Sequence, residues 1–88
     1  MLRITSQSNG PRGTRLVLEG RLAGEAVDEL RRVASELAGQ GRRLALDLVA
    51  LRYADAAGIG LLRELLSDSA ELQRASAFVS AHLEEPTP

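Results

Sequence analysis

The residues best placed to do chemistry lie in one segment, residues 44–65, which reads LALDLVALRYADAAGIGLLREL. An apolar run is followed by a connector, then by Asp55, Ala56, Ala57 and Gly58, and then by an amphipathic helical pattern. Strand-to-helix junctions often hold functional groups, because a helix N-terminus exposes unpaired N–H groups and carries a positive partial charge. The two alanines bring no hydroxyl, thiol or imidazole to this junction. The segment therefore favours binding over catalysis.

Other residue types that serve in enzymes are too few or badly placed to form a catalytic site. The chain has no cysteine, and His82 is its one histidine, without a second ligand residue at metal-binding spacing. Asp47 and Asp55 are two nearby carboxylates, but Asp47 lies within the apolar run and is expected to be structural. No glycine-rich phosphate loop is present. We therefore expect no enzyme activity, no catalytic residue, no cofactor and no metal.

Composition predicts one small domain with a modest aliphatic core. The chain has 88 residues, of which 44% are hydrophobic and 2% aromatic, so aliphatic side chains must fill one modest core. A net charge of −1 argues against nucleic-acid binding, although all eleven basic residues are arginine. No apolar run approaches the roughly 18 residues of a membrane span. The sequence thus predicts a cytoplasmic protein without membrane insertion.

Hydrophobic periodicity predicts the elements that must position the junction. Alternating and apolar runs indicate strands, whereas apolar residues recurring at three and four positions indicate helices. Turn-forming residues at 9–13 favour a hairpin between the first two strands, and Ser76 is placed to cap the last helix. Strands are expected at 2–6, 14–19, 44–48 and, less securely, 70–73, and helices at 25–37, 58–67 and 77–83, with a connector over 49–54.

The expected order is β-β-α-β-α-(β)-α in a single domain over residues 1–85, followed by a frayed C-terminal end at 86–88. This is an α/β fold, in which right-handed crossovers place the helices on one face of a small mixed sheet. The other face must be covered by side chains, by a terminus or by a second copy of the chain. A homodimer is therefore one alternative for this protein.

The segment 44–65 resembles the signature of STAS domains, a family of bacterial anti-sigma-factor antagonists and transporter-associated relatives. The family pattern is an apolar strand ending in Asp-Leu, a short connector, Asp-Ser-Ser/Thr-Gly and a leucine-rich helix. Asp47-Leu48 matches the strand end, Asp55 and Gly58 match the motif, and residues 59–62 match the helix start. Residues 16–22 are similar to the family's second strand and its turn into the first helix.

One departure from the family pattern changes the expected function. In antagonists controlled by a partner-switching kinase, the second hydroxyl residue of the motif is phosphorylated, and here that position is Ala57. The resemblance implies that the unmodified form binds the partner. We therefore expect a signalling protein of transcription regulation that binds a kinase-like anti-sigma factor without phosphorylation control. The alternatives are a STAS accessory subunit of a bacterial ABC transporter of the lipid-transport type, and a unit that mainly self-associates.

The expected partner surface combines the junction with the turn that follows the second strand. Arg21, in that turn, should lie at the same end of the sheet and contact acidic groups of a partner. Asp55 is expected to cap the helix, or alternatively to contact the partner directly. Gly58 and Gly60 lower helix propensity, which suggests close approach to a neighbouring strand or to the partner. The partner-binding candidates are Arg21, Asp55, Ala56, Ala57, Gly58, Ile59, Gly60 and Leu61.

Overall fold

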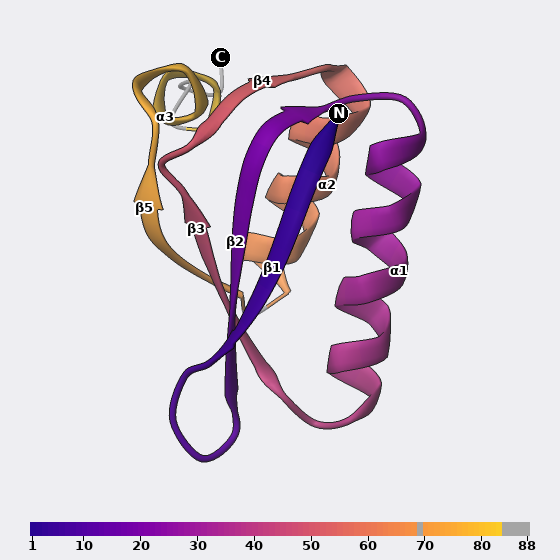
Figure 1. The fold of residues 1–88 in the computed structure, drawn as a ribbon, viewed down its shortest axis with the longest axis vertical. Coiled ribbons are helices and arrows are strands. Elements are labelled where there is room, and N and C mark those ends of the chain that lie inside the picture. Colours follow the sequence, from indigo (N-terminus) through magenta and orange to yellow (C-terminus); the bar gives the residue numbers. More distant parts are fainter. Residues whose placement is uncertain (69, 84–88) are drawn as a thin grey trace.

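The computed structural model describes residues 1–68 and 70–83 and confirms the expected small α/β fold with a mixed sheet (Figure 1). The predicted frayed end at 86–88 lies outside the described residues. Both uncertain features of the sequence pattern are resolved, since the last strand forms and Ser76 caps the last helix by accepting the Val79 N–H. The elements are β1 (Leu2–Ser8), β2 (Gly13–Leu22), α1 (Glu25–Gly39), β3 (Arg43–Leu48), β4 (Leu51–Ala54), α2 (Ala56–Ser67), β5 (Glu71–Ala75) and α3 (Ala77–Leu83).

The sheet has the order β1-β2-β3-β5, and β4 lies beside β2 beyond the end of β3. β1 is antiparallel to β2, whereas β3 and β4 both run parallel to it. Part of the predicted connector is therefore a strand, because β4 continues the path of β3 along β2. Gly20 permits the accompanying irregularity in β2: its φ is +100°, its N–H donates to the Ala50 carbonyl, and a Cβ there would collide with the Met1 carbonyl oxygen.

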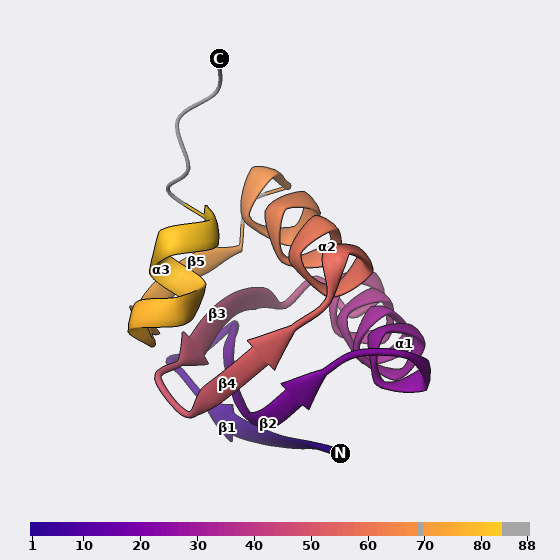
Figure 2. The same cartoon turned by 90° about the horizontal axis from the view of Figure 1, so that it is seen from above.

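Helices α1 and α2 lie side by side on one face of the sheet, as Figure 2 shows from above. Helix α3 packs against β4, β5 and α2, at the end of the sheet where β4 lies (Figure 1). Leucines from β2, β3, β4 and both long helices meet between these layers, which accounts for a core almost free of aromatic residues. The fully buried leucines are Leu16, Leu18, Leu22, Leu30, Leu46, Leu48, Leu51 and Leu62.

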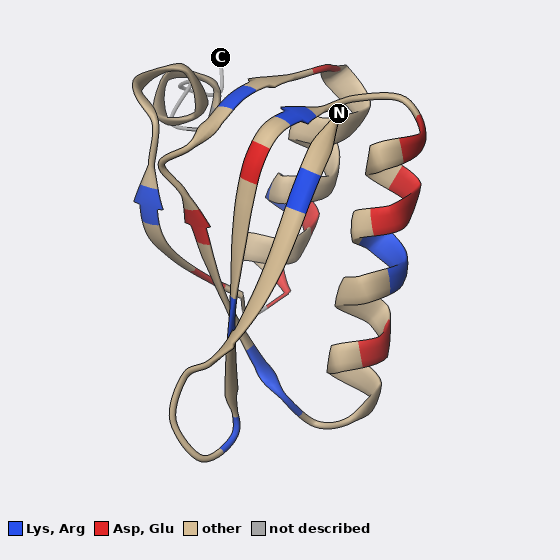
Figure 3. Cartoon of the chain, viewed as in Figure 1, with Lys and Arg blue, Asp and Glu red and all other residues tan. Residues whose placement is uncertain are grey.

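On the opposite face of the sheet lie the residues of β1 and β2 that alternate with the buried ones, such as Gln7, Arg15 and Glu19, and Figure 3 marks the charged residues of these strands. Arg15 on β2 donates to Gln7, its direct register partner on β1, at 2.6 Å. Such a face is solvated by water and needs no apolar cover.

Asp47 is a charged residue buried on that face, because its side chain is only 2% exposed. Arg74 on β5 donates to its Oδ2 at 2.8 Å, and the Val49 N–H donates to Oδ1 at 3.3 Å. The hydrogen bond from Arg74 holds the pKa of the Asp47 carboxyl below its usual value, and the bond from Val49 acts in the same direction against the effect of burial. Asp47 therefore fastens β3 to β5 and to the bend before β4, as expected of a structural residue.

The ion pair between Asp47 and Arg74 predicts how the free energy of unfolding depends on pH. A carboxyl whose pKa is lowered on folding contributes stability that is present above its unfolded pKa, about 3.9, and is lost as the pH falls through the folded value. The urea midpoint of the wild type should therefore fall more steeply below about pH 4 than that of Arg74→Met. Arg31→Met, which breaks the exposed pair with Glu64, is the control. Equal slopes for the wild type and Arg74→Met would contradict the lowered pKa.

Candidate interaction site at the start of α2

The junction is built where two parallel strands end at the same edge of the sheet. β2 ends at Leu22 and β4 at Ala54, and these two residues are paired. Each strand leads into a helix, so the turn before α1 and the start of α2 lie side by side (Figure 1). Chain segments at the carboxyl ends of parallel strands are the usual place for binding groups in such folds. The geometry of this edge is therefore the geometry of the candidate site.

Asp55 links the two segments through its carboxylate. Its Oδ1 accepts the Gly58 N–H at 2.7 Å and caps α2, while its Oδ2 accepts the Gly24 N–H at 3.2 Å from the turn before α1. The cap confirms the structural role predicted for this residue. The second bond extends that role, because it fixes the spacing between the helix start and the neighbouring turn. Both oxygens serve the fold, which leaves direct contact with a partner a secondary role.

Gly58 is required by close packing against β2. A Cβ at this position would lie 2.5 Å from the Leu22 carbonyl oxygen and 3.0 Å from Leu22 Cγ. The Asp55 N–H donates to the same carbonyl at 3.1 Å. The glycine thus allows α2 to start against a strand end, which is the first of the two explanations that the sequence offered for it. Gly60 differs, because a Cβ there would meet nothing within 4 Å.

Helix α2 begins two residues earlier than expected. Its helical period divides the predicted partner-binding residues between exposed and buried positions. Ala56, Ala57 and Gly60 are exposed. Ile59 and Leu61 are 8% and 2% exposed and belong to the hydrophobic core. The side chain of Leu61 is therefore withdrawn from the surface, contrary to the set expected from the sequence, whereas that of Ile59 reaches solvent only where it lines a groove beside α3. Leucine and isoleucine at these positions hold α2 on the sheet so that the small residues face outward.

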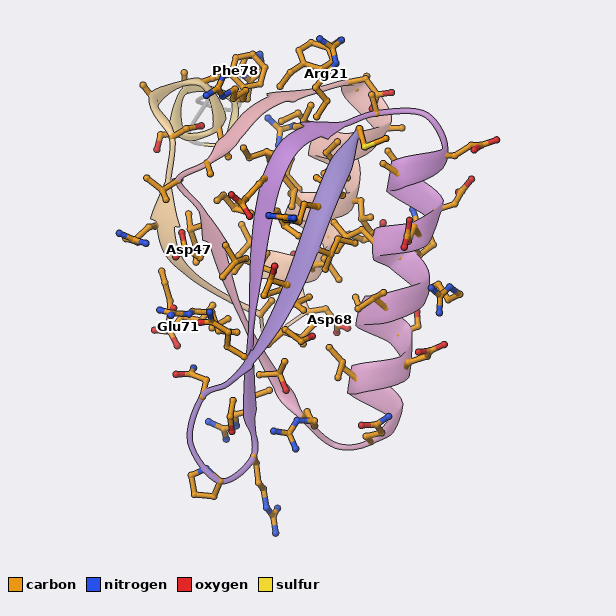
Figure 4. The ribbon with its side chains drawn as sticks, in the orientation of Figure 1. Arg21, Asp47, Asp68, Glu71 and Phe78 are labelled. Carbon is orange, nitrogen blue, oxygen red and sulfur yellow. The ribbon has the colours of Figure 1, made fainter. Side chains whose placement is uncertain are left out.

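Arg21 lies at the junction end of the sheet, as predicted. It pairs with Tyr53 across β2 and β4, and its guanidinium carbon lies 4.6 Å from the centre of the tyrosine ring. Figure 4 shows Arg21 at the same end of the molecule as Phe78 of α3. A cation held over an aromatic face is stabilised by the negative charge density of the ring. The arginine is thus positioned by β4, a strand that the sequence pattern did not predict.

Sequence reasoning missed a cluster of rings beside this arginine. The ring centres of Tyr53 and Phe78 are 5.9 Å apart, and those of Phe78 and His82 are 4.2 Å apart. His82 Nδ1 lies 2.8 Å from the Phe78 carbonyl oxygen, which fixes the ring against α3. The spacing of Phe78 and His82, one helical turn apart, was the available signal. No sequence pattern indicated that Tyr53 would lie beside these two rings.

The cluster borders an open groove of about 450 Å³ between the start of α2 and α3. Its described lining residues are Tyr53, Ala54, Asp55, Ala56, Ile59, Gly60, Arg63, Phe78 and His82. In the part of the chain that the structure describes, no three carboxylate or imidazole side chains are grouped as metal ligands. No described helix is long and apolar enough to cross a membrane. The arrangement offers apolar contact area and positive charge, which suit binding.

Comparison with known proteins adds no relative, since no family model matches the sequence and no curated protein matches it significantly.

The two glycines of α2 predict opposite effects on stability. Gly60→Ala should raise the free energy of unfolding by about 0.5–1 kcal/mol, because alanine favours the helix and its Cβ enters open space. Gly58→Ala should lower it by about 1–3 kcal/mol, because its Cβ would press on the Leu22 carbonyl. Urea unfolding of both variants measures the difference. A stabilised Gly58→Ala would show that the close approach is absent.

Proposed function

We propose that this protein is a non-enzymatic, STAS-like interaction module that binds a kinase-like anti-sigma factor through the start of α2. The proposal rests on the motif resemblance together with the geometry of the junction. By this proposal the protein acts as an antagonist: binding removes the anti-sigma factor from its sigma factor and so regulates transcription. It does so without phosphorylation control at the usual position.

The exposed position of Gly60 is the observation that supports the proposal most directly. Glycine inside a helix costs about 1 kcal/mol relative to alanine, and here no neighbouring atom requires it. Together with the exposed Ala56 and Ala57 it makes the first two turns of α2 a surface of small side chains. A partner's backbone can approach such a surface closely. Selection for contact with a partner explains a residue that internal packing does not.

The same surface is held in a defined position by the core and by Asp55. Ile59 and Leu61 anchor one side of the helix, and the Asp55 carboxylate joins its start to Gly24. A surface that is already ordered loses little conformational entropy on binding. These contacts support an interface formed without rearrangement of the junction.

Ala57 determines the proposed mode of control. A phosphate at this exposed position would add about −1.5 to −2 charges to a surface that otherwise has small neutral side chains. The methyl group of Ala57 accepts no phosphate, so the surface stays in the state that the family resemblance associates with partner binding. The module is therefore proposed to be a constitutive binder whose activity is set by its abundance.

Ala57→Glu tests this interface by placing a charge at the centre of the small-residue surface. The tagged protein is purified from its native cells, and the proteins bound to it are identified and quantified by mass spectrometry. A soluble kinase-like ATPase should be recovered with the wild type and lost with Ala57→Glu. The matched control is Ala38→Glu, because Ala38 is exposed in the last turn of α1, at the opposite end of that helix from the junction.

Three other outcomes would overturn the proposal in different ways. Recovery of an ABC-type ATPase with membrane subunits would assign the chain to a transporter. Recovery of its own untagged copy alone would leave self-association. Equal recovery of the kinase with the wild type and with Ala57→Glu would move the interface away from α2. If the kinase partner is confirmed, we expect it to phosphorylate the serine of the Ala57→Ser variant. The phosphorylated variant should then bind that kinase more weakly than the unphosphorylated variant does.

A further inference from the structure

We propose that the groove between α2 and α3 binds a segment of the protein partner that carries an aromatic or large aliphatic side chain next to acidic residues. This inference rests on the proposed function for the existence of a protein partner, and it adds the chemistry by which that partner is recognised. The groove adjoins the small-residue surface, because Ala56 and Gly60 belong to both. One partner segment can therefore contact the two together.

The apolar side of the groove is formed by rings and by the edge of the core. The chain contains one tyrosine, one phenylalanine, one histidine and no tryptophan, and the three rings all lie here. Tyr53 is 37% exposed although it is the largest side chain in the sequence. Ile59 and Ala54 close the bottom of the groove. Exposed aromatic side chains beside a recess are characteristic of positions that dominate binding energy in interfaces.

The position of the rings at the groove is informative because the chain has so few aromatic residues. Leucine, valine, isoleucine and alanine fill the core, and Phe78 is only partly buried against it. Tyr53 and His82 are exposed and Phe78 is half-buried, so part of each of these scarce rings lies at this surface. Tyrosine provides a large, rigid contact area at low entropy cost, with a hydroxyl for hydrogen bonding. The ring cluster is thus suited to hold one anchoring side chain of a partner.

Charge around the groove selects the flanking residues of the partner. Arg21 lies over one face of the Tyr53 ring, and Arg63 on α2 borders the groove and donates to the His82 carbonyl oxygen at 2.6 Å. Of the described residues that line the groove, Asp55 alone is acidic, and both of its oxygens already accept backbone N–H groups. Arg21 therefore presents an exposed positive charge beside the ring cluster, and this charge complements a carboxylate. Charge complementarity of this kind fixes partner choice and orientation.

Selection of a random peptide library displayed on phage against the immobilised wild-type protein tests the inference directly. Enriched peptides should combine a Phe, Tyr, Trp or Leu anchor with neighbouring Asp or Glu. A synthetic peptide of the enriched sequence should bind Tyr53→Ser and Arg21→Glu at least about tenfold more weakly than the wild type, as measured by fluorescence polarisation. Arg32→Glu, on the exposed surface of α1, should bind it as the wild type does.

Folding is checked separately, so that lost binding is not mistaken for lost structure. Circular dichroism and urea unfolding of Tyr53→Ser and Arg21→Glu should match the wild type closely, because both side chains are exposed. If Tyr53→Ser is unstable, Arg21→Glu carries the test alone. Enriched peptides without acidic residues, or peptides that bind Arg21→Glu as tightly as the wild type, would overturn the inference. So would the absence of enriched peptides combined with dimerisation of the chain that depends on Tyr53, since the occupant would then be a second copy.

The failure of this inference is distinguishable from the failure of the proposed function. Loss of the co-purified partner with Ala57→Glu but not with Tyr53→Ser or Arg21→Glu would keep the α2 interface and overturn the groove. Loss of the partner with the groove variants alone would keep the groove and place the interface beside α2. Retention of the partner in all of these variants would overturn both proposals.

Discussion

The hydrogen bonds of the Asp55 carboxylate are the interaction on which the geometry of the proposed binding site depends. One carboxylate satisfies two backbone N–H groups from segments more than thirty positions apart in the sequence, at the starts of the two long helices. Because β2 and β4 run parallel, their ends lie together, and two chain turns must be accommodated at one edge. Asp55 fixes the distance between those turns, and Gly58 allows the closeness by leaving room for the Leu22 carbonyl.

Helix α2, which starts at this edge, has one side that packs on the sheet and another that is exposed. Its larger apolar residues pack against the sheet, and its small residues remain outside, because side chains a turn apart share a face. This division explains how a chain with so small a core can maintain an exposed surface of alanine and glycine. The core stabilises the position of that surface, while the surface itself contributes little to stability. The proposed binding surface and the residues that pack on the sheet thus lie on opposite sides of α2.

Much of this could be predicted from the sequence, and the failures have physical causes. The apolar periods predicted α1 and the main strands, and the Asp-x-x-Gly spacing predicted the cap. β4 was missed because Arg52 and Tyr53 interrupt its apolar pattern, and because its pairing depends on the irregularity at Gly20, a tertiary feature. Ile59 and Leu61 were assigned to the surface because the sequence does not say how a helix is rotated against the sheet. The ring cluster was missed for a similar reason, since Phe78 is brought beside Tyr53 by the pairing of β5 with β3, which is a tertiary feature.

Site-specific cross-linking tests the central claim, that the exposed start of α2 is a protein interface, most directly. A photoreactive amino acid is placed at position 57, or at position 38 as the control, and native cells expressing either variant are irradiated. The proposed interface predicts one specific cross-linked partner from position 57, recovered with a peptide map that locates the contact, and none of that partner from position 38. Cross-linking of the same partner from position 38 but not from position 57 would contradict the claim.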